Sequence, residues 1–203
     1  NGVLQSNVQP GDVKYVDVNH DGTINANDKV DLGNGLPKYT FGFNFTLGYK
    51  GFDLSANFTG AAGFQIAQSY RDPSGSQGNY SHRILGRWTG EGTSNEMPRV
   101  TYGDVGNWLF SDLYLQDGDY IRLQNLTLGY DFKKLISWKG LSKLRLYFQV
   151  QNLFTLTKYD GMDPEIGSYN GTDGNSSDSW VSGVDMGYYP HPRTFIVGVN
   201  VAF

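Results

Sequence analysis

Length, composition and charge limit what this chain can be. Its 203 residues suit one domain or two small ones, and its net charge of −4 gives no basic footprint for nucleic acid. The lack of Cys excludes a disulfide framework and a thiolate metal site. Only 18% of the residues are charged, whereas Gly, Tyr and Phe number 27, 14 and 12, which favours β structure. No apolar run approaches the roughly 18 residues of a membrane-spanning helix.

The first 37 residues are polar and rich in turn residues, and they contain one sharply spaced motif. Residues 17–28 read DVNHDGTINAND, the pattern of an EF-hand-type loop with Gly22 at the sharp turn. Asp at the last position, in place of Glu, shortens the arm that closes such a site. The motif predicts a Ca²⁺ site, with Mg²⁺ as the alternative ion and a solvated cluster of Asx turns as the metal-free alternative. The expected ligands are Asp17, Asn19, Asp21, Thr23 (through its backbone carbonyl), Asn25 and Asp28.

Five segments with period-two alternation follow, and each predicts a β-strand. In the first, large apolar side chains fill the odd positions from Tyr39 to Tyr49, while Thr, Asn and Gly fill the even ones. At about 3.3 Å per residue and a tilt of ~45°, such a strand rises roughly 28 Å, close to the apolar thickness of a bilayer. The expected strands span residues 38–49, 52–60, 119–132, 143–154 and 193–203.

Two local features refine this prediction. Lys50-Gly51 is a two-residue turn signal in which Gly can adopt a positive φ. In the third strand, Ile121 and Leu123 have the opposite parity to the apolar residues from Leu126 onward. Either a β-bulge near Gln124-Asn125 reconciles the two halves, or the upper half turns inward against the loops.

The connections between the strands alternate between short and long. Lys50-Gly51 and 133–142 are short, whereas 61–118 and 155–192 are long and irregular. Between the ends of the strands, the apolar faces carry no charged residue, and aromatic residues gather at the strand ends. These features predict an all-β fold, a segment of a transmembrane antiparallel β-barrel in the bacterial outer membrane, with short periplasmic turns and long extracellular loops. A soluble β-sandwich is the alternative.

The final strand fixes the expected topology. Phe203 closes it in the manner of the signal read by the barrel-assembly machinery, although an ordinary sheet edge is the alternative reading. With Phe203 in the periplasm, residues 1–37 are extracellular, as are both long connections, and residues 38–203 form the barrel part. Because five strands cannot close a bacterial barrel, the other strands are expected N-terminal to Asn1, in another polypeptide or another piece of a chain nicked within an extracellular loop.

No catalytic constellation is apparent. Asp163 and Glu165 stand at i and i+2, so in an extended loop their side chains are expected on opposite sides. His20, His82 and His191 lie in separate loops and are expected to face solvent. The chain contains no nucleophile elbow or HExxH motif, so an enzyme is not expected.

Several stretches, taken in order, resemble the SusC/RagA-like branch of TonB-dependent outer-membrane transporters. Each motif is weak alone, whereas the ordered set is specific and covers essentially the whole chain. The stretches are PGDVKY (10–15) leading into 17–28, LPKY (36–39), YKGFDLS (49–55), YIRLQNLTLGY (120–130), VQNLFT (150–155), DPE (163–165) and PRTF (192–195).

The resemblance implies a fold, a function and partners. The chain would supply about five C-terminal strands of a barrel of roughly 22 strands with a plugged lumen. Such transporters import glycans, or in some members peptides, with energy passed through TonB, and a SusD-like surface lipoprotein caps the barrel. The remaining barrel, the plug and the TonB-binding part would be N-terminal to this chain. A passive outer-membrane pore or an autotransporter-type barrel is the alternative function.

Aromatic residues of the long connections are the expected contacts to sugar rings or to the lipoprotein lid. For each of them, loop packing is the competing interpretation. Trp138, in a periplasmic turn, is expected to anchor the chain at the membrane interface. The candidate contacts are Tyr80, Trp88, Trp108, Tyr169 and Trp180.

Overall fold

The computed structural model describes residues 5, 7–68, 82–100, 106–166 and 183–203, without the side chains of Trp108 and Lys134. The chain divides into two compact units, and each is described by itself. The first combines Asn1–Leu32 with Arg71–Tyr114, and the second combines Gly33–Tyr70 with Leu115–Phe203. The predicted boundary at residue 37 stays a prediction.

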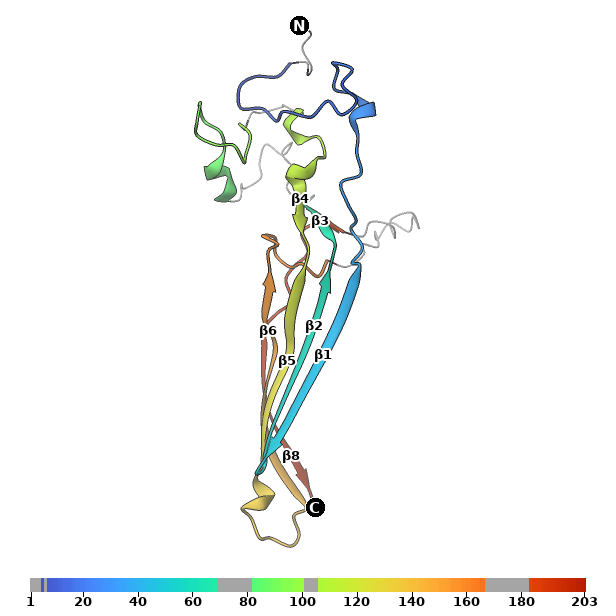
Figure 1. The fold of residues 1–203 in the computed structure, drawn as a ribbon. Helices are drawn as coiled ribbons and strands as arrows, with labels where there is room; N and C mark the ends of the chain where they lie inside the picture. The colour runs from blue at the N-terminus through green and yellow to red at the C-terminus, as the bar shows by residue number, and fades with distance from the viewer. Residues whose placement is uncertain (1–4, 6, 69–81, 101–105, 167–182) are drawn as a thin grey trace, which may run out of the picture. The chain divides into compact units, whose positions relative to one another are not determined.

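The second unit is built on one five-stranded sheet in which every neighbouring pair is antiparallel (Figure 1). The five expected strands are present, and β6 runs three residues further than predicted. In spatial order they are β1 (Tyr39–Tyr49), β2 (Phe52–Ala62), β5 (Tyr120–Asp131), β6 (Lys143–Thr157) and β8 (Thr194–Ala202).

The two long connections contain structure that the sequence did not predict. A second, three-stranded sheet has the order β4-β3-β7, with β3 antiparallel to β4 and parallel to β7. The expectation of irregular segments at 61–118 and 155–192 was therefore wrong at these strands, which are too short to show a period. Their bounds are β3 (Gln65–Gln68), β4 (Leu115–Asp117) and β7 (Val184–Asp185).

The described residues also form five short 3-10 helices. None of the helices in the described part of the chain is long and apolar enough to cross a bilayer. The five are η1 (Ala26–Asp28), η2 (His82–Gly86), η3 (Gly106–Trp108), η4 (Asp112–Tyr114) and η5 (Phe132–Lys134).

The turn between β1 and β2 has the predicted form. Lys50 and Gly51 adopt φ angles of 47° and 97°, and Tyr49 pairs with Phe52 across the turn. Two successive positive φ values define the tight hairpin turn whose twist matches that of the flanking strands. This turn fixes the register of the whole β1–β2 ladder.

The predicted bulge in the third main strand is also confirmed. Asn57 pairs with Asn125 but Phe58 pairs with Leu123, so Gln124 is the extra residue of β5. On its other side, β5 shifts register against β6, where Asn152 has a φ of 52°. The bulge brings Leu123 onto the same face as Phe58 and resolves the reversed parity.

The sheet therefore has two chemically distinct faces. The apolar face carries large exposed side chains whose rings meet between strands. The ring centroids of Phe52 and Tyr130 are 4.4 Å apart, and those of Phe148 and Phe195 are 6.2 Å apart. The polar face carries Asp53, whose carboxylate bonds Arg145 at 2.5 and 2.7 Å across β5. Gly129 makes this crossing possible, because a Cβ there would lie 2.5 Å from both side chains.

Candidate functional site

The acidic loop at 17–28 folds through its own side chains. The Asp28 carboxylate accepts the backbone N–H groups of Val18 (2.9 Å) and Asn25 (2.7 Å) and so closes the loop on itself. Asn25 caps η1 by accepting the N–H of Asn27. These bonds, led by that from Asn25, hold the pKa of Asp28 below its ordinary value, which keeps the carboxylate ionised at neutral pH.

Asp17 and Asp21 accept bonds in the same loop. Asp17 Oδ2 accepts the N–H of Gly22 at 2.9 Å, and Asp21 Oδ1 accepts the N–H of Thr23 at 2.8 Å. The other oxygen of Asp17, Oδ1, is buried and has no hydrogen-bond partner. A buried carboxylate oxygen without a donor is costly, and a cation would satisfy it.

The remaining predicted ligands fit a hard cation only as a mixed set. Among the described residues, no group of three His, Cys, Asp or Glu side chains lies close enough to hold a metal. A cation in this loop would need the amide oxygens of Asn19 and Asn25 and the carbonyl of Thr23 beside the carboxylates. That mixture of donors is the one expected of an EF-hand-type loop.

A second polar cluster, which the sequence did not predict, surrounds Arg122 on the polar side of β5. The Arg122 side chain is 3% exposed, and its guanidinium binds the carboxylate of Asp163, whose side chain is 4% exposed. It also bonds Glu165 at 2.7 Å and the Thr155 hydroxyl at 2.9 Å. The expectation that Asp163 and Glu165 point to opposite sides was wrong, because both reach one guanidinium.

His191 joins the same cluster instead of only facing solvent. Its Nδ1 lies 3.0 Å from Asp163 Oδ2 and 3.0 Å from Arg122 Nη1, while about half of the side chain stays exposed. Next to it, the Pro192 carbonyl accepts a bond from the amide of Asn152 at 3.1 Å. The motifs containing Arg122 and Asp163 thus meet in one network, and the bond between Asn152 and Pro192 follows it in sequence just before β8 begins.

The charge balance of this network favours structure over catalysis. Burial alone would raise the pKa of Asp163, but bonds from His191 and from the Glu165 N–H, with the charge of Arg122, hold it below its ordinary value. Asp163 is therefore an ionised, fully partnered group. A general acid or base would need a pKa nearer to neutrality.

The PGDVKY motif is anchored in the first unit. Asp12 bonds Arg99 at 2.5 Å and the amide of Asn107 at 2.9 Å. Asn107 Oδ1 accepts the N–H of Val13 at 2.7 Å, and the Tyr15 hydroxyl donates to the carbonyl of Gly106 at 2.8 Å. These bonds join residues nearly 100 positions apart, which a single sequence does not reveal.

The candidate aromatic contacts lie mostly outside what the structure describes. Tyr80, Tyr169 and Trp180 fall outside the described residues, and of Trp108 only the backbone, in η3, is described. The ring of Trp88 lies against Gly11, where an added Cβ would come within 2.3 Å of it. This contact is of the packing kind, and the substrate or lid roles stay predictions.

Trp138, which is expected to lie at the membrane interface, and Phe203 are both exposed. Trp138 is 59% exposed and Phe203 84% exposed, and their rings meet edge-on with centroids 6.2 Å apart. The side chain that closes the last strand therefore packs on the predicted interface anchor. The role of Phe203 as an assembly signal stays a prediction.

Comparison with known proteins gives relatives over almost the whole chain. TonB-dependent receptors P3 and P26 of Formosa agariphila are 34% and 33% identical over 98% and 95% of this chain. The TonB-dependent receptor SusC of Bacteroides thetaiotaomicron is 28% identical over 99% of it. The chain spans only about a fifth of the length of these relatives, between 18% and 20%. No family model matches the chain.

Solved structures give the same fold. A structure of the RagAB peptide transporter matches 90% of this chain and 19% of its own, with a TM-score of 0.68 and 24% identity. The RagAB peptide importer in its 'closed-closed' state matches 96% of this chain and 20% of its own, with a TM-score of 0.67 and 24% identity. The all-β prediction is confirmed by these structures. The outer-membrane and non-enzyme predictions agree with the relatives, which are TonB-dependent receptors. The chain is a homologue of one part of the TonB-dependent receptors, the group that includes SusC.

Proposed function

We propose that this chain forms part of the barrel wall, and of the outer loops, of a TonB-dependent transporter that brings nutrients across the outer membrane. The single observation that carries the proposal is homology to TonB-dependent receptors over 95–99% of the chain. The open antiparallel sheet supports it, since a wall segment must present an apolar face to lipid and a polar face to the lumen. The large exposed apolar side chains on one face of the main sheet and the short β1–β2 turn fit that role.

The cargo is a glycan or a peptide, delivered with the help of a SusD-like surface lipoprotein and of TonB acting on the N-terminal part. SusC is the relative that supports this partnership, and RagAB is described as a peptide importer. The plug and the remaining barrel strands complete the transporter. Contacts to cargo or lid are assigned to the aromatic side chains of the long connections.

The test is co-purification from detergent-solubilised outer membranes with an antibody to the connection between β6 and β8. Mass spectrometry is expected to find further barrel sequence, a plug and a lipoprotein together with this segment. The fold of the lipoprotein and a growth screen of a deletion strain on glycans and peptides then narrow the cargo. Recovery of this segment alone, from the soluble fraction, would contradict the proposal.

We also propose that the loop at 17–28 binds Ca²⁺, or Mg²⁺ in its place. The support is the partnerless, buried Oδ1 of Asp17 beside a loop already closed by Asp28. When bound, the ion would hold the loop through oxygen ligands at positions 1, 3, 5, 7, 9 and 12 of the motif. The loop would then contribute a rigid element to the first unit.

Calorimetry on the chelator-treated transporter tests the calcium proposal. Asp17→Asn keeps an oxygen that can accept from the Gly22 N–H but removes the charge, so Ca²⁺ affinity is expected to fall about tenfold or more. Asp112→Asn, an exposed acid in η4, is the matched control and should leave the affinity unchanged. Absence of binding heat in the unmodified protein, or equal affinity in Asp17→Asn, would contradict the proposal.

A further inference from the structure

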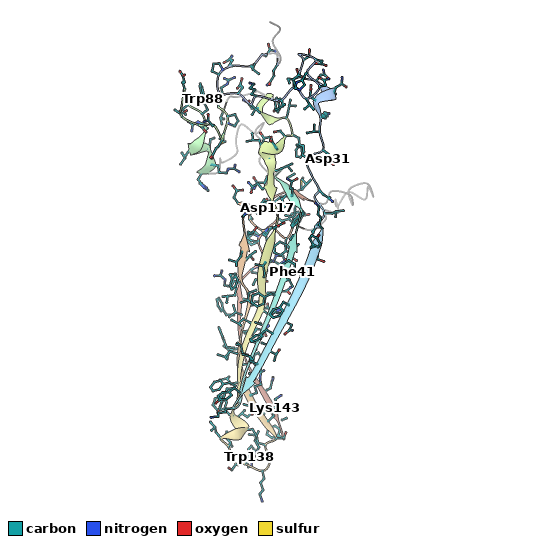
Figure 2. All side chains as sticks on the ribbon, viewed as in Figure 1. Asp31, Phe41, Trp88, Asp117, Trp138 and Lys143 are labelled. Carbon is teal, nitrogen blue, oxygen red and sulfur yellow. The ribbon has the colours of Figure 1, made fainter. Side chains whose placement is uncertain are left out.

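The end of the main sheet that holds the short turns is basic and aromatic, although the chain as a whole is acidic. The β1–β2 turn, the β5–β6 connection and the end of β8 meet there, as the pairing of Lys143 with Ala202 and of Phe52 with Tyr130 requires. Figure 2 shows Trp138 and Lys143 at this end and Asp117 at the other. We call this end the basic rim: Lys50, Lys133, Trp138, Lys139, Lys143 and Phe203.

Exposed positive charge is concentrated at this rim. Lys50, Lys139 and Lys143 are exposed. The two acids nearby are already engaged, since Asp53 pairs with Arg145 and Asp131 caps η5. At the opposite end of the same strands, Asp117 and Asp119 precede β5 and Asp160 follows β6, beside Lys38 and Lys158, so an excess of bases is confined to the rim.

Apolar side chains are exposed beside these lysines. Leu135 is 68% exposed and Trp138 59%, and Phe203 packs edge-on against Trp138. The connection is nevertheless well built: the Lys133 ammonium bonds the Trp138 carbonyl at 2.8 Å, Leu141 is buried, and the Ser142 N–H bonds the Ala202 carbonyl at 2.8 Å. Exposed aromatics on an ordered turn are typical of a residue belt at a membrane–water interface.

We infer that the basic rim binds anionic phospholipid headgroups of the periplasmic leaflet. The inference rests on the proposed function, which places this end of the sheet in the periplasm. Trp138, Leu135 and Phe203 would enter the interface, while Lys139, Lys143 and Lys50 would contact phosphate oxygens. Phospholipid is favoured as occupant because the surface combines an apolar belt with exposed cations, the two features that an anionic bilayer surface complements.

The experiment uses the whole transporter, purified from outer membranes and titrated with phosphatidylglycerol or phosphatidylethanolamine, with binding followed by native mass spectrometry. Replacing two exposed lysines in Lys139→Gln/Lys143→Gln is expected to weaken phosphatidylglycerol binding about tenfold or more and to weaken phosphatidylethanolamine binding much less, because that headgroup has no net charge. The matched control is Lys38→Gln/Lys158→Gln. These two exposed lysines flank β1 and β6 at the end of the sheet away from the basic rim, and the variant should bind like the unmodified protein.

Two outcomes overturn the inference: equal phosphatidylglycerol affinity in the rim variant, or an equal loss in the control variant, which would indicate diffuse charge attraction. Brominated phosphatidylglycerol supplies a second measurement. The emission that it quenches in the unmodified transporter should exceed that quenched in Trp138→Phe by the share of one tryptophan, and equal quenched emission would also overturn the inference. Failure of the proposed function would look different, since the protein would then be missing from the outer-membrane fraction from which it is purified.

Discussion

Arg122 shows how one residue can order several segments of this chain. Its guanidinium and the Asp163 carboxylate are both almost fully buried, and Glu165, Thr155 and His191 surround them. A buried ion pair contributes little net stability against an apolar replacement, but removing one partner leaves an uncompensated charge. The network therefore acts mainly by fixing where the segments before β8 lie.

Replacement of Arg122 by Met tests this role. We expect Arg122→Met to destabilise the folded transporter by about 3–5 kcal/mol, because the Asp163 carboxylate would stay buried without its cation. The measurement is the temperature at which the barrel loses its compact, heat-modifiable gel mobility. Glu165→Gln is the matched control: the Glu165 side chain is 45% exposed, so its loss should cost at most about 1 kcal/mol. Similar shifts for both variants would contradict this account.

At the scale of single elements, the β1–β2 turn makes the clearest prediction. Gly51 has a φ of 97°, a conformation that an L residue adopts at a cost of about 1–2 kcal/mol. We expect Gly51→Ala to lower the stability by about that amount and to slow barrel assembly, which pulse-chase labelling of the heat-modifiable form can follow. Lys50→Asn is the control, because Asn tolerates the φ of 47° at this position and should be neutral or better. An unchanged assembly rate in Gly51→Ala would count against the turn as the element that sets the register.

Strand length separates the elements that the sequence predicted from those that it did not predict. Long strands with one apolar face, such as Tyr39–Tyr49, can be recognised because apolar residues alternate with a period of two. The change of parity at Leu123 likewise indicates the bulge. The strands β3, β4 and β7 have four residues or fewer, too few for a period to show. They form because Ile66 is buried with Phe64 and Tyr159, a contact between residues far apart in sequence.

The same distinction applies to the candidate sites. The loop at 17–28 could be recognised because all its ligands lie within twelve residues and follow a fixed spacing. The Arg122 network could not, because its members come from β5, from the segment after β6 and from the segment before β8. An i, i+2 rule for extended chains misplaced Asp163 and Glu165, since the backbone there is not a strand. One arginine near the start of β5, a strand whose other charged residue is its last, Asp131, was the available signal.

At the scale of the whole molecule, the two outer strands of the main sheet need further strands to pair with in a membrane. Its outer strands, β1 and β8, each have one paired neighbour within the described residues, so their outer edges carry unpaired backbone groups. In lipid such groups must be satisfied by further strands. The matched relatives, of which this chain spans about a fifth, have the length to supply them. Exposed apolar side chains such as Phe43 then face acyl chains, and their neighbours on the other face look into the barrel.

Adjacent substitutions in β1 test that orientation directly. Phe43 and Asn44 are neighbours in the middle of the strand, both exposed in this chain, but on opposite faces. If the apolar face meets the bilayer, Phe43→Arg should cost about 2–4 kcal/mol, because it places a charge near the midplane, whereas Asn44→Arg puts the same charge in the lumen. Outer-membrane abundance and the heat-modifiable fraction should therefore fall sharply for Phe43→Arg and little for Asn44→Arg. Equal effects would mean that the two faces meet similar surroundings, which no membrane barrel permits.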